Sequence, residues 1–310
     1  MTLYPIVQNG EYGFIRDDGA VSIAPQYESA MTFSDGLAGI QRNGKWGFIN
    51  ASGDVVIPPR FDSCLPFAYG LAVVKDGDST QYVDTSGRIA ISTEFYRCDS
   101  FEDDLAPVMP DIRSKGAFID RNGRVVLSGR NYLISHFSHG LINCPEAGKW
   151  GYINRSGDFK IAPQYAHAYP FHDGLAAVAL RNEDAFRFID TRGQVAIDAE
   201  FQGADIRFSN GLCAVWNEHY GYIDRSGRLV IPYRFYFAGH FSGGLAVIKE
   251  PDSALYGYVN ELGEIAIKQS FTCADSFVGK LAPVIVGAKY ESYHYGYIDR
   301  KGAYVWRPSR

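Results

Sequence analysis

The stretch Lys45-Trp46-Gly47-Phe48-Ile49-Asn50-Ala51-Ser52-Gly53 decides the fold, because it recurs in recognisable form nine times along the 310-residue chain. One aromatic residue, Phe48 in this copy, marks each unit, and successive markers lie 34 to 39 residues apart. Spacing of this regularity is typical of a tandem repeat protein. The nine markers are Phe14, Phe48, Tyr82, Phe118, Tyr152, Phe188, Tyr222, Tyr258 and Tyr297.

Each unit contains a predicted hairpin turn just after its marker. Asn or Asp occupies the position of Asn50 in eight units, with Arg16 as the exception, and Gly occupies the position of Gly53 in all nine. An Asn or Asp side chain can hydrogen-bond to the turn backbone, and Gly adopts positive φ without steric strain. We therefore expect an aromatic strand before the turn and an aliphatic strand after it, ending at Pro58 and Pro59.

A third strand completes the unit, so the sequence predicts an all-β chain of nine three-stranded antiparallel meanders. Residues 36–40, Gly-Leu-Ala-Gly-Ile, form this strand before the aromatic strand, and the meanders run from Tyr4 to Trp306. Propeller blades usually have four strands, and propellers usually have four to eight blades. We therefore favour an open superhelical solenoid, with a closed propeller-like ring as the alternative.

The connectors between meanders are as regular as the strands. Most connectors carry one aromatic anchor, followed by a Phe such as Phe67 and then by a Leu such as Leu71. Apolar anchors at fixed positions indicate a packed connector rather than a loose loop.

The chain resembles the bacterial WG repeat, also called the KWG repeat, over essentially all of its length from Tyr4 to Trp306. The copies that carry the resemblance best begin at Lys45, Lys149 and Tyr220. The resemblance implies an interaction module without known catalytic residues. Three units depart from the motif, with Gln81, Ala117 and Arg187 in place of its Gly, which indicates either drift or a specialised face. The motif residues are Trp46, Gly47, Gly53, Trp150, Gly151, Gly157, Tyr220, Gly221 and Gly227.

Composition limits the classes of function. The repeat predicts one array over residues 1–310 with a shared core, although the length alone would suggest two domains. The net charge is −5, from 30 basic and 35 acidic residues that are interspersed along the chain. Without a basic patch we expect no nucleic-acid or membrane partner. The N-terminus does not resemble a leader and no long apolar segment occurs, so the expected location is the cytoplasm.

No pattern in the sequence indicates catalysis, a cofactor or a metal. The five cysteines lack CxxC spacing and replace small apolar residues of the repeat, so we expect all five to be buried and unpaired. His136, His139, His167 and His172 lie in neighbouring connectors, but we interpret them as turn residues because no Cys or carboxylate recurs beside them. Nucleophile elbows and glycine-rich phosphate loops are absent, and we expect that the protein is not an enzyme.

The aromatic residues offer the remaining functional signal. Of 45 aromatics, 31 occupy four repeat positions and are expected to form the core. Eight of the others fall in the last 95 residues, and Tyr with Arg is the combination enriched at interface hot spots. Either these residues cap the last meander or the C-terminal third binds a partner. The candidate partner surface comprises Trp216, Tyr233, Arg234, Tyr236, His240, Tyr290 and Tyr293.

Two classes of function are compatible with this sequence. The favoured one is a non-catalytic scaffold that binds another protein, either as a regulator or as the neutralising partner of a bacterial toxin. The alternative is a module that binds glycan or cell-wall material through exposed aromatics. A wall binder would be exported, so the absence of a leader in this sequence favours the scaffold.

Overall fold

The computed structural model describes residues 2–113, 115–129, 137–181, 185–205, 207–287 and 294–307. The chain divides into two compact units. Unit 1 comprises Met1–His136 with Arg155–Gly157, and unit 2 comprises Phe137–Asn154 with Asp158–Arg310.

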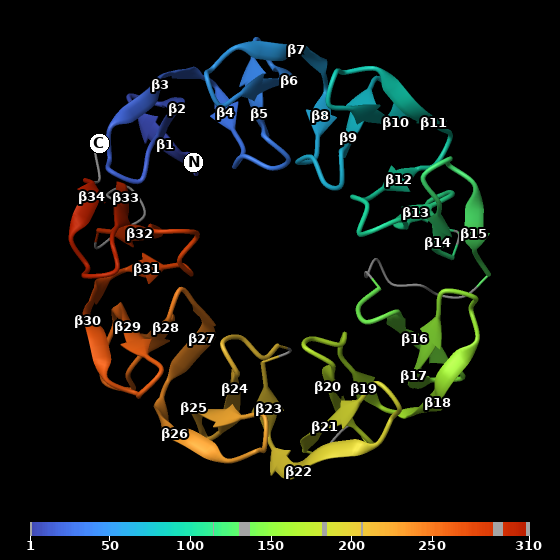
Figure 1. The fold of residues 1–310 in the computed structure, drawn as a ribbon, viewed down its shortest axis with the longest axis vertical. Coiled ribbons are helices and arrows are strands. Elements are labelled where there is room, and N and C mark those ends of the chain that lie inside the picture. The colour runs from blue at the N-terminus through green and yellow to red at the C-terminus, as the bar shows by residue number, and fades with distance from the viewer. Residues whose placement is uncertain are drawn as a thin grey trace. The chain divides into compact units, whose positions relative to one another are not determined.

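Unit 1 contains four antiparallel sheets, formed by β1–β3, β4–β7, β8–β11 and β12–β15. In Figure 1 the sheets of this unit follow one another in chain order, with β3, β7, β11 and β15 on the outer side. Its strands are β1 Tyr4–Gln8, β2 Glu11–Ile15, β3 Val21–Tyr27, β4 Ser29–Ala30, β5 Leu37–Arg42, β6 Lys45–Asn50, β7 Val55–Phe61, β8 Ser63–Cys64, β9 Leu71–Asp76, β10 Ser79–Asp84, β11 Ile89–Thr93, β12 Arg97–Cys98, β13 Ala106–Met109, β14 Ala117–Ile119 and β15 Val125–Leu127.

Unit 2 contains five antiparallel sheets of the same kind, formed by β16–β18, β19–β22, β23–β26, β27–β30 and β31–β34. Its strands are β16 Leu141–Glu146, β17 Lys149–Asn154, β18 Phe159–Tyr165, β19 His167–Ala168, β20 Leu175–Ala179, β21 Phe186–Asp190, β22 Val195–Phe201, β23 Gly203–Ala204, β24 Leu212–Asn217, β25 His219–Asp224, β26 Leu229–Phe235, β27 Phe237–Ser242, β28 Leu245–Lys249, β29 Tyr256–Asn260, β30 Ile265–Phe271, β31 Cys273–Ala274, β32 Ala282–Val286, β33 His294–Ile298 and β34 Tyr304–Trp306.

The sheets are propeller blades, which corrects the expected architecture. Of the nine sheets in the described residues, seven have a fourth strand, contributed by the preceding connector and paired with the first strand of the meander. In the second sheet Ser29 pairs with Gln41 and Ala30 with Ile40. Four-stranded antiparallel sheets that pack in chain order are characteristic of β-propellers. The predicted open superhelical solenoid of three-stranded meanders is therefore wrong, and the propeller-like alternative holds for the blades.

A tight turn creates the fourth strand. Asp35 and Gly36 have φ of +49° and +81°, and the amide and carbonyl groups of Ser34 and Leu37 bond to each other across them. Two consecutive residues with positive φ form the turn that best matches the twist of a hairpin. In the next connector Phe67, at the position of Phe33, is 1% exposed, so that connector is packed as predicted.

Glycine at Gly47 allows a close approach of two strands. Between the pairs Trp46–Phe61 and Phe48–Ile57, strand β7 has three residues where β6 has one. The bulge presses against β6, so a Cβ atom on Gly47 would lie 2.4 Å from the Ile57 carbonyl oxygen. In the third sheet, where Gln81 replaces the Gly, residues 80 to 82 pair with 93 to 91 without a bulge. Gln81 therefore does not face the bulge that approaches Gly47.

The turn at Asn50 is confirmed. The Asn50 side-chain oxygen accepts hydrogen bonds from the Ser52 and Asp54 amides, each at 2.9 Å, and Gly53 has φ of +89°. These bonds satisfy turn groups that would otherwise need water.

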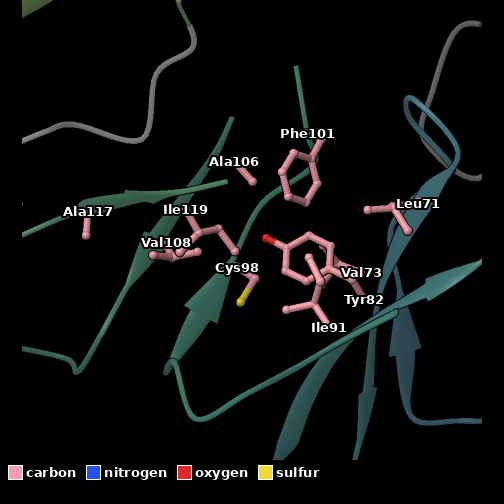
Figure 2. Packing of buried hydrophobic residues seen from close by; sticks show 10 residues of the cluster. All are labelled: Leu71, Val73, Tyr82, Ile91, Cys98, Phe101, Ala106, Val108, Ala117 and Ile119. Atoms are coloured by element: carbon pink, nitrogen blue, oxygen red, sulfur yellow. The ribbon is translucent and has the colours of Figure 1, made fainter. Parts of the chain in front are cut away.

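The core between blades is built from the marker aromatics and the connector Phe residues. Tyr82 and Phe101 come from neighbouring sheets, and their rings lie 5.1 Å apart at 62° (Figure 2). Aromatic pairs favour such edge-to-face geometry. The buried Tyr82 hydroxyl donates a hydrogen bond of 2.9 Å to the Asp99 carbonyl oxygen. Equivalent pairs are Phe14–Phe33, Phe48–Phe67, Tyr152–Phe171, Phe188–Phe208, Tyr222–Phe241 and Tyr258–Phe277.

The cysteines agree with the sequence except at one position. Cys64, Cys98, Cys144 and Cys213 are buried, and none of them forms a disulfide. Cys273 is also unpaired but exposed, so the prediction that all five are buried is wrong there. It begins the short strand β31, whereas Cys64 and Cys98 end β8 and β12 and point into the core.

Candidate partner-binding surface

The candidate surface lies at one end of the blades, which we call the hairpin end. It is the end at which a hairpin joins the first two strands of each meander. In the sheet β23–β26 this hairpin places Trp216 opposite Tyr220. In the next sheet Phe237 pairs with Lys249, and Tyr256 pairs with the buried Phe271 on the outer strand. These pairs of residues on adjacent strands bring side chains from different strands to the same end of two neighbouring blades.

Six residues at this end form what we call the aromatic patch: Trp216, Tyr220, Tyr236, Phe237, Lys249 and Tyr256. The Phe237 ring lies 6.3 Å from the Tyr220 ring of the preceding blade and 5.6 Å from the Tyr256 ring of its own blade. Tyr236 is 65% exposed, Phe237 38% and Trp216 37%. Contiguous exposed aromatic surface of this kind is uncommon away from interaction sites.

Lys249 fixes the geometry of the patch. Its Nζ atom lies 5.6 Å from the Tyr236 ring centroid and 5.3 Å from the Tyr256 ring centroid. A cation in this position is attracted by the electron-rich ring faces. The Tyr236 amide also donates a hydrogen bond of 2.8 Å to the Lys249 carbonyl oxygen. Tyr236 is thus held in place although most of its side chain is in contact with solvent.

The local sequence explains why the patch forms on this blade. A single residue, Tyr236, separates β26 from β27, as at most other blade junctions, and it is 65% exposed. β27 has six residues, whereas the short strands β4, β8, β12, β19, β23 and β31 have two each. A register shift between Ala238 and Phe241 accommodates the extra length. Phe237 therefore begins a well-paired strand at the edge of the blade.

Carboxylates surround the aromatic side chains. Glu218 lies at the tip of the β24–β25 hairpin with φ of +64°, and Glu250 and Asp252 lie in the loop from β28 to β29. Within the ranges that the structure describes, none of these three carboxylates has a hydrogen-bond or ion-pair partner. The loop is closed instead by Ser253, whose hydroxyl accepts from the Leu255 amide at 3.0 Å and donates to the Leu255 carbonyl oxygen at 2.9 Å.

The structure brings together only some of the residues predicted as a partner surface. Trp216 and Tyr236 belong to the patch. Tyr233 is partly buried against the core between two blades, where burial raises its pKa. Arg234 donates to the Gly263 carbonyl oxygen and stacks 4.7 Å from the Phe235 ring, and the His240 Nε2 atom lies 3.3 Å from the Ser276 hydroxyl. Tyr290 and Tyr293 lie outside the described residues.

The predicted partner surface omitted four of the six patch residues, namely Tyr220, Phe237, Lys249 and Tyr256. Tyr220 and Tyr256 were assigned to the core because they occupy a repeat position, two residues before the marker. Aromatics at that position are half-buried and pack at the margin of the core, except that Tyr295 is 62% exposed, so the core prediction holds only in part. Phe237 carried a signal, since the other short strands begin with Ser29, Ser63, Arg97, His167, Gly203 and Cys273.

A second feature is a pocket of about 630 Å³ in unit 2 that is lined in part by Arg187. Here the bulge is retained although Arg187 replaces the Gly, because Phe186 pairs with Phe201 and Phe188 with Ile197. Arg187 forms ion pairs with Asp198, at 3.7 Å, and with Glu200. The positive charge of Arg187 is therefore neutralised by two carboxylates of the bulge that lies opposite it.

The histidines do not assemble a metal site in the described part of the chain, where no group of three potential ligands occurs. His167 begins β19 at the hairpin end, whereas His172 pairs with Leu175 in the turn at the opposite end of the blade. The pKa of His172 is lowered by burial and by Arg207. His136 lies outside the described residues.

Comparison with known protein families identifies the repeat from which these blades are built. A sequence model described as WG containing repeat matches residues 12–46, 46–78, 82–109, 150–183, 186–215, 220–250 and 256–290, well over half of the chain. The chain belongs to the WG repeat family. The predicted resemblance is confirmed, and family and fold together indicate a binding scaffold. No curated protein matches the sequence significantly.

Solved structures resemble this WG repeat chain in fold. A crystal structure of a eukaryotic initiation factor is 10% identical, with a TM-score of 0.67 over 98% of this chain and 94% of that chain. Dihydro-heme d1 dehydrogenase NirN in complex with DHE is 14% identical, with a TM-score of 0.50 over 86% of this chain and 72% of that chain. At such identities the likeness bears on fold alone. No helix in the described residues is long and apolar enough to cross a membrane.

Proposed function

We propose that this WG repeat protein is a non-catalytic scaffold that binds another protein through the aromatic patch. The observation that carries the proposal is the contact between Phe237, Tyr220 and Tyr256 across two blades, with Tyr236 and Trp216 exposed beside them. Large, rigid aromatic side chains are the usual anchors of protein interfaces. Tyr220 and Tyr256 pack against the margin of the core, while Tyr236, Phe237 and Trp216 remain exposed.

The proposal includes no reaction. Neutralisation of a toxin, expected from the sequence as one option, is one form that the scaffold function can take, as is regulation of another protein. The identity of the captured protein distinguishes them. Glycan binding is the competing function, because exposed aromatic rings also stack on sugars.

The experiment is capture from native extract by the tagged protein and two variants, read by mass spectrometry. Trp216→Ala with Tyr236→Ala removes exposed patch side chains. The matched control is Tyr96→Ala, because Tyr96 occupies the same repeat position as Tyr236 and is 59% exposed but lies in unit 1. We expect one stoichiometric protein to be lost with the patch variant and kept with the control.

Equal capture by both variants would show that the patch is not the binding surface. Retention of polysaccharide without protein, again lost with the patch variant, would replace the scaffold by the glycan-binding function. Melting temperatures of the variants are measured in parallel, since a large loss would indicate that the patch serves stability.

A further inference from the structure

We propose that the segment bound by the aromatic patch is basic and presents Arg or Lys side chains to the rings and carboxylates. This inference rests on the proposed function and specifies the chemistry of the partner. Its basis is the arrangement of charge around Trp216, Tyr236 and Phe237.

Three carboxylates beside the aromatic patch are not used by the fold. Glu218, Glu250 and Asp252 lie on the two hairpins that flank the patch and have no partner within the described residues. At the same end of unit 1, by contrast, Glu28 and Asp62 are used by the fold. Glu28 accepts hydrogen bonds from the Asn43 and Gly44 amides at 2.9 and 2.8 Å.

Asp62 shows the same use of a carboxylate in the next blade. It accepts from the Gly77 amide at 2.7 Å and from Lys45 at 2.5 Å. The bond from Lys45 is the main reason that the pKa of Asp62 is lowered. Three carboxylates without partners beside exposed rings therefore favour a binding role, because the repeat does not need them there.

The basic groups at the patch do not offset this charge. The ammonium group of Lys249 lies over the Tyr236 and Tyr256 rings, and the Arg234 guanidinium is bonded to the Gly263 carbonyl oxygen. The net charge of the whole chain is −5. Electrostatic complementarity therefore attracts a cationic segment and repels an acidic one.

The rings suit the same partner. Lys249 shows that these ring faces accept a cation at 5.3 to 5.6 Å. A guanidinium group can stack on Trp or Tyr while it bonds to a carboxylate, and it loses less hydration than an ammonium group does. Trp216 and Glu218 are two residues apart on one hairpin, so one Arg side chain can contact both.

The test uses the full chain and three fluorescent peptides of equal length, built from alternating Leu with Arg, citrulline or Glu. Fluorescence anisotropy is measured at low and high salt. We expect the Arg peptide to bind at least about tenfold more tightly than the citrulline peptide, and the difference to shrink at high salt, where the Debye length falls. The Glu peptide should not bind.

Two variants assign the effect to the patch. Glu218→Gln with Glu250→Gln and Asp252→Asn should weaken the Arg peptide about tenfold and flatten its salt dependence, since charge–charge attraction is lost. Glu28→Gln, a carboxylate at the same end of unit 1, should leave the affinity unchanged.

Equal affinity for the Arg and citrulline peptides, no binding of either, or unchanged affinity in the triple variant would overturn the inference. The captured partner separates this failure from that of the proposed function. If the triple variant still captures the protein that Trp216→Ala with Tyr236→Ala loses, the scaffold function stands and the basic segment is wrong. If neither variant loses any protein, both proposals fail.

Discussion

The hairpin ends of unit 1 and unit 2 use one repeat position for two purposes. In unit 1 this position holds Glu28 and Asp62, which bind turn amides of the adjoining hairpin. In one blade of unit 2, β27–β30, it holds Tyr236, whose ring faces solvent and Lys249. The hairpin beside Tyr236 is closed by Ser253 instead. A position that caps a turn in one unit is therefore released for recognition in the other, because another residue has taken over the capping.

Position alone does not produce this difference. Tyr96 in unit 1 is also an exposed Tyr at the position of Tyr236, yet its blade begins with Arg97 on a strand of two residues. The patch requires Phe237 on the longer strand β27, together with Tyr220 from the preceding blade. The comparison teaches that an interaction surface on a repeat protein arises from several departures that coincide on neighbouring units.

The largest expected effect concerns the scaffold on which this comparison rests. Gly47→Ala places a Cβ atom 2.4 Å from the Ile57 carbonyl oxygen, so we expect a loss of about 3 kcal/mol in the free energy of unfolding, the upper range for overpacking. Gln81→Ala, at the same position of a blade without the bulge, should change it by less than about 1 kcal/mol. Urea denaturation of both variants measures the difference. Equal losses would show that the close approach of Ile57 does not make Gly47 more sensitive to an added side chain.

A smaller effect separates the two uses of the shared position. Glu28→Ala leaves the Asn43 and Gly44 amides to water, and we expect a loss of about 1 kcal/mol in stability. Tyr236→Ala should change stability by less than about 0.5 kcal/mol, because its side chain is largely exposed. Thermal unfolding of both variants tests this. A larger loss for Tyr236→Ala would assign Tyr236 to the fold and break the contrast between the units.

The sequence predicted what is local and repeated. The Asn50–Gly53 turn and the packed Phe67 connector follow from residue types at fixed spacing, and both are present. The fourth strand was not predicted, because Ser29–Ala30 is too short to show an alternation of apolar and polar residues. The turn at Asp35–Gly36 was the available signal, since an Asp-Gly pair between apolar residues favours a hairpin.

The candidate surface was only partly predictable for a different reason. Alternation places Tyr256 on the same sheet face as the buried Tyr258, but Tyr256 lies nearer the hairpin end and is less covered. Lys249 gains its role only because β27 and β28 pair in register. The exposure of Tyr256 and the position of Lys249 cannot be predicted from the spacing of residues within one strand, since both depend on where neighbouring strands end.

Both units should lose stability at acidic pH to a similar extent. This shared loss is a reference against which the differences between their hairpin ends can be compared. The Ser86 hydroxyl donates to Asp84 at 2.6 Å and the Ser226 hydroxyl to Asp224 at 2.6 Å. These bonds, with turn amides, lower the pKa of each carboxyl to about 2. The unfolded value is about 4, so the unfolded state binds more protons between about pH 4 and 2. The stability that these groups contribute is complete above about pH 4 and is lost as the pH falls towards 2.

Single variants in each unit measure that response. Ser86→Ala and Ser226→Ala remove the leading donors, so both should reduce the dependence of stability on pH in this range, and to a similar extent. Urea denaturation at several values between about pH 2 and 5 gives the slopes. A change confined to one variant would show that the shared turn is not equivalent in the two units.

The smallest perturbation is chemical labelling of thiols, which compares the units without substitution. Burial raises the pKa of Cys64 to about 12 and raises the pKa of Cys98 and Cys213, while Cys273 is exposed. Because the thiolate is the reactive form, a maleimide should modify Cys273 in the native protein well before the others. Mass spectrometry over time identifies each site.

The slow thiols report opening of their own blades, with Cys64 and Cys98 in unit 1 and Cys213 in unit 2. Similar slow rates would show that the aromatic patch is carried by blades as stable as those of unit 1, whereas fast labelling of Cys213 would show that recognition was gained at the expense of local stability.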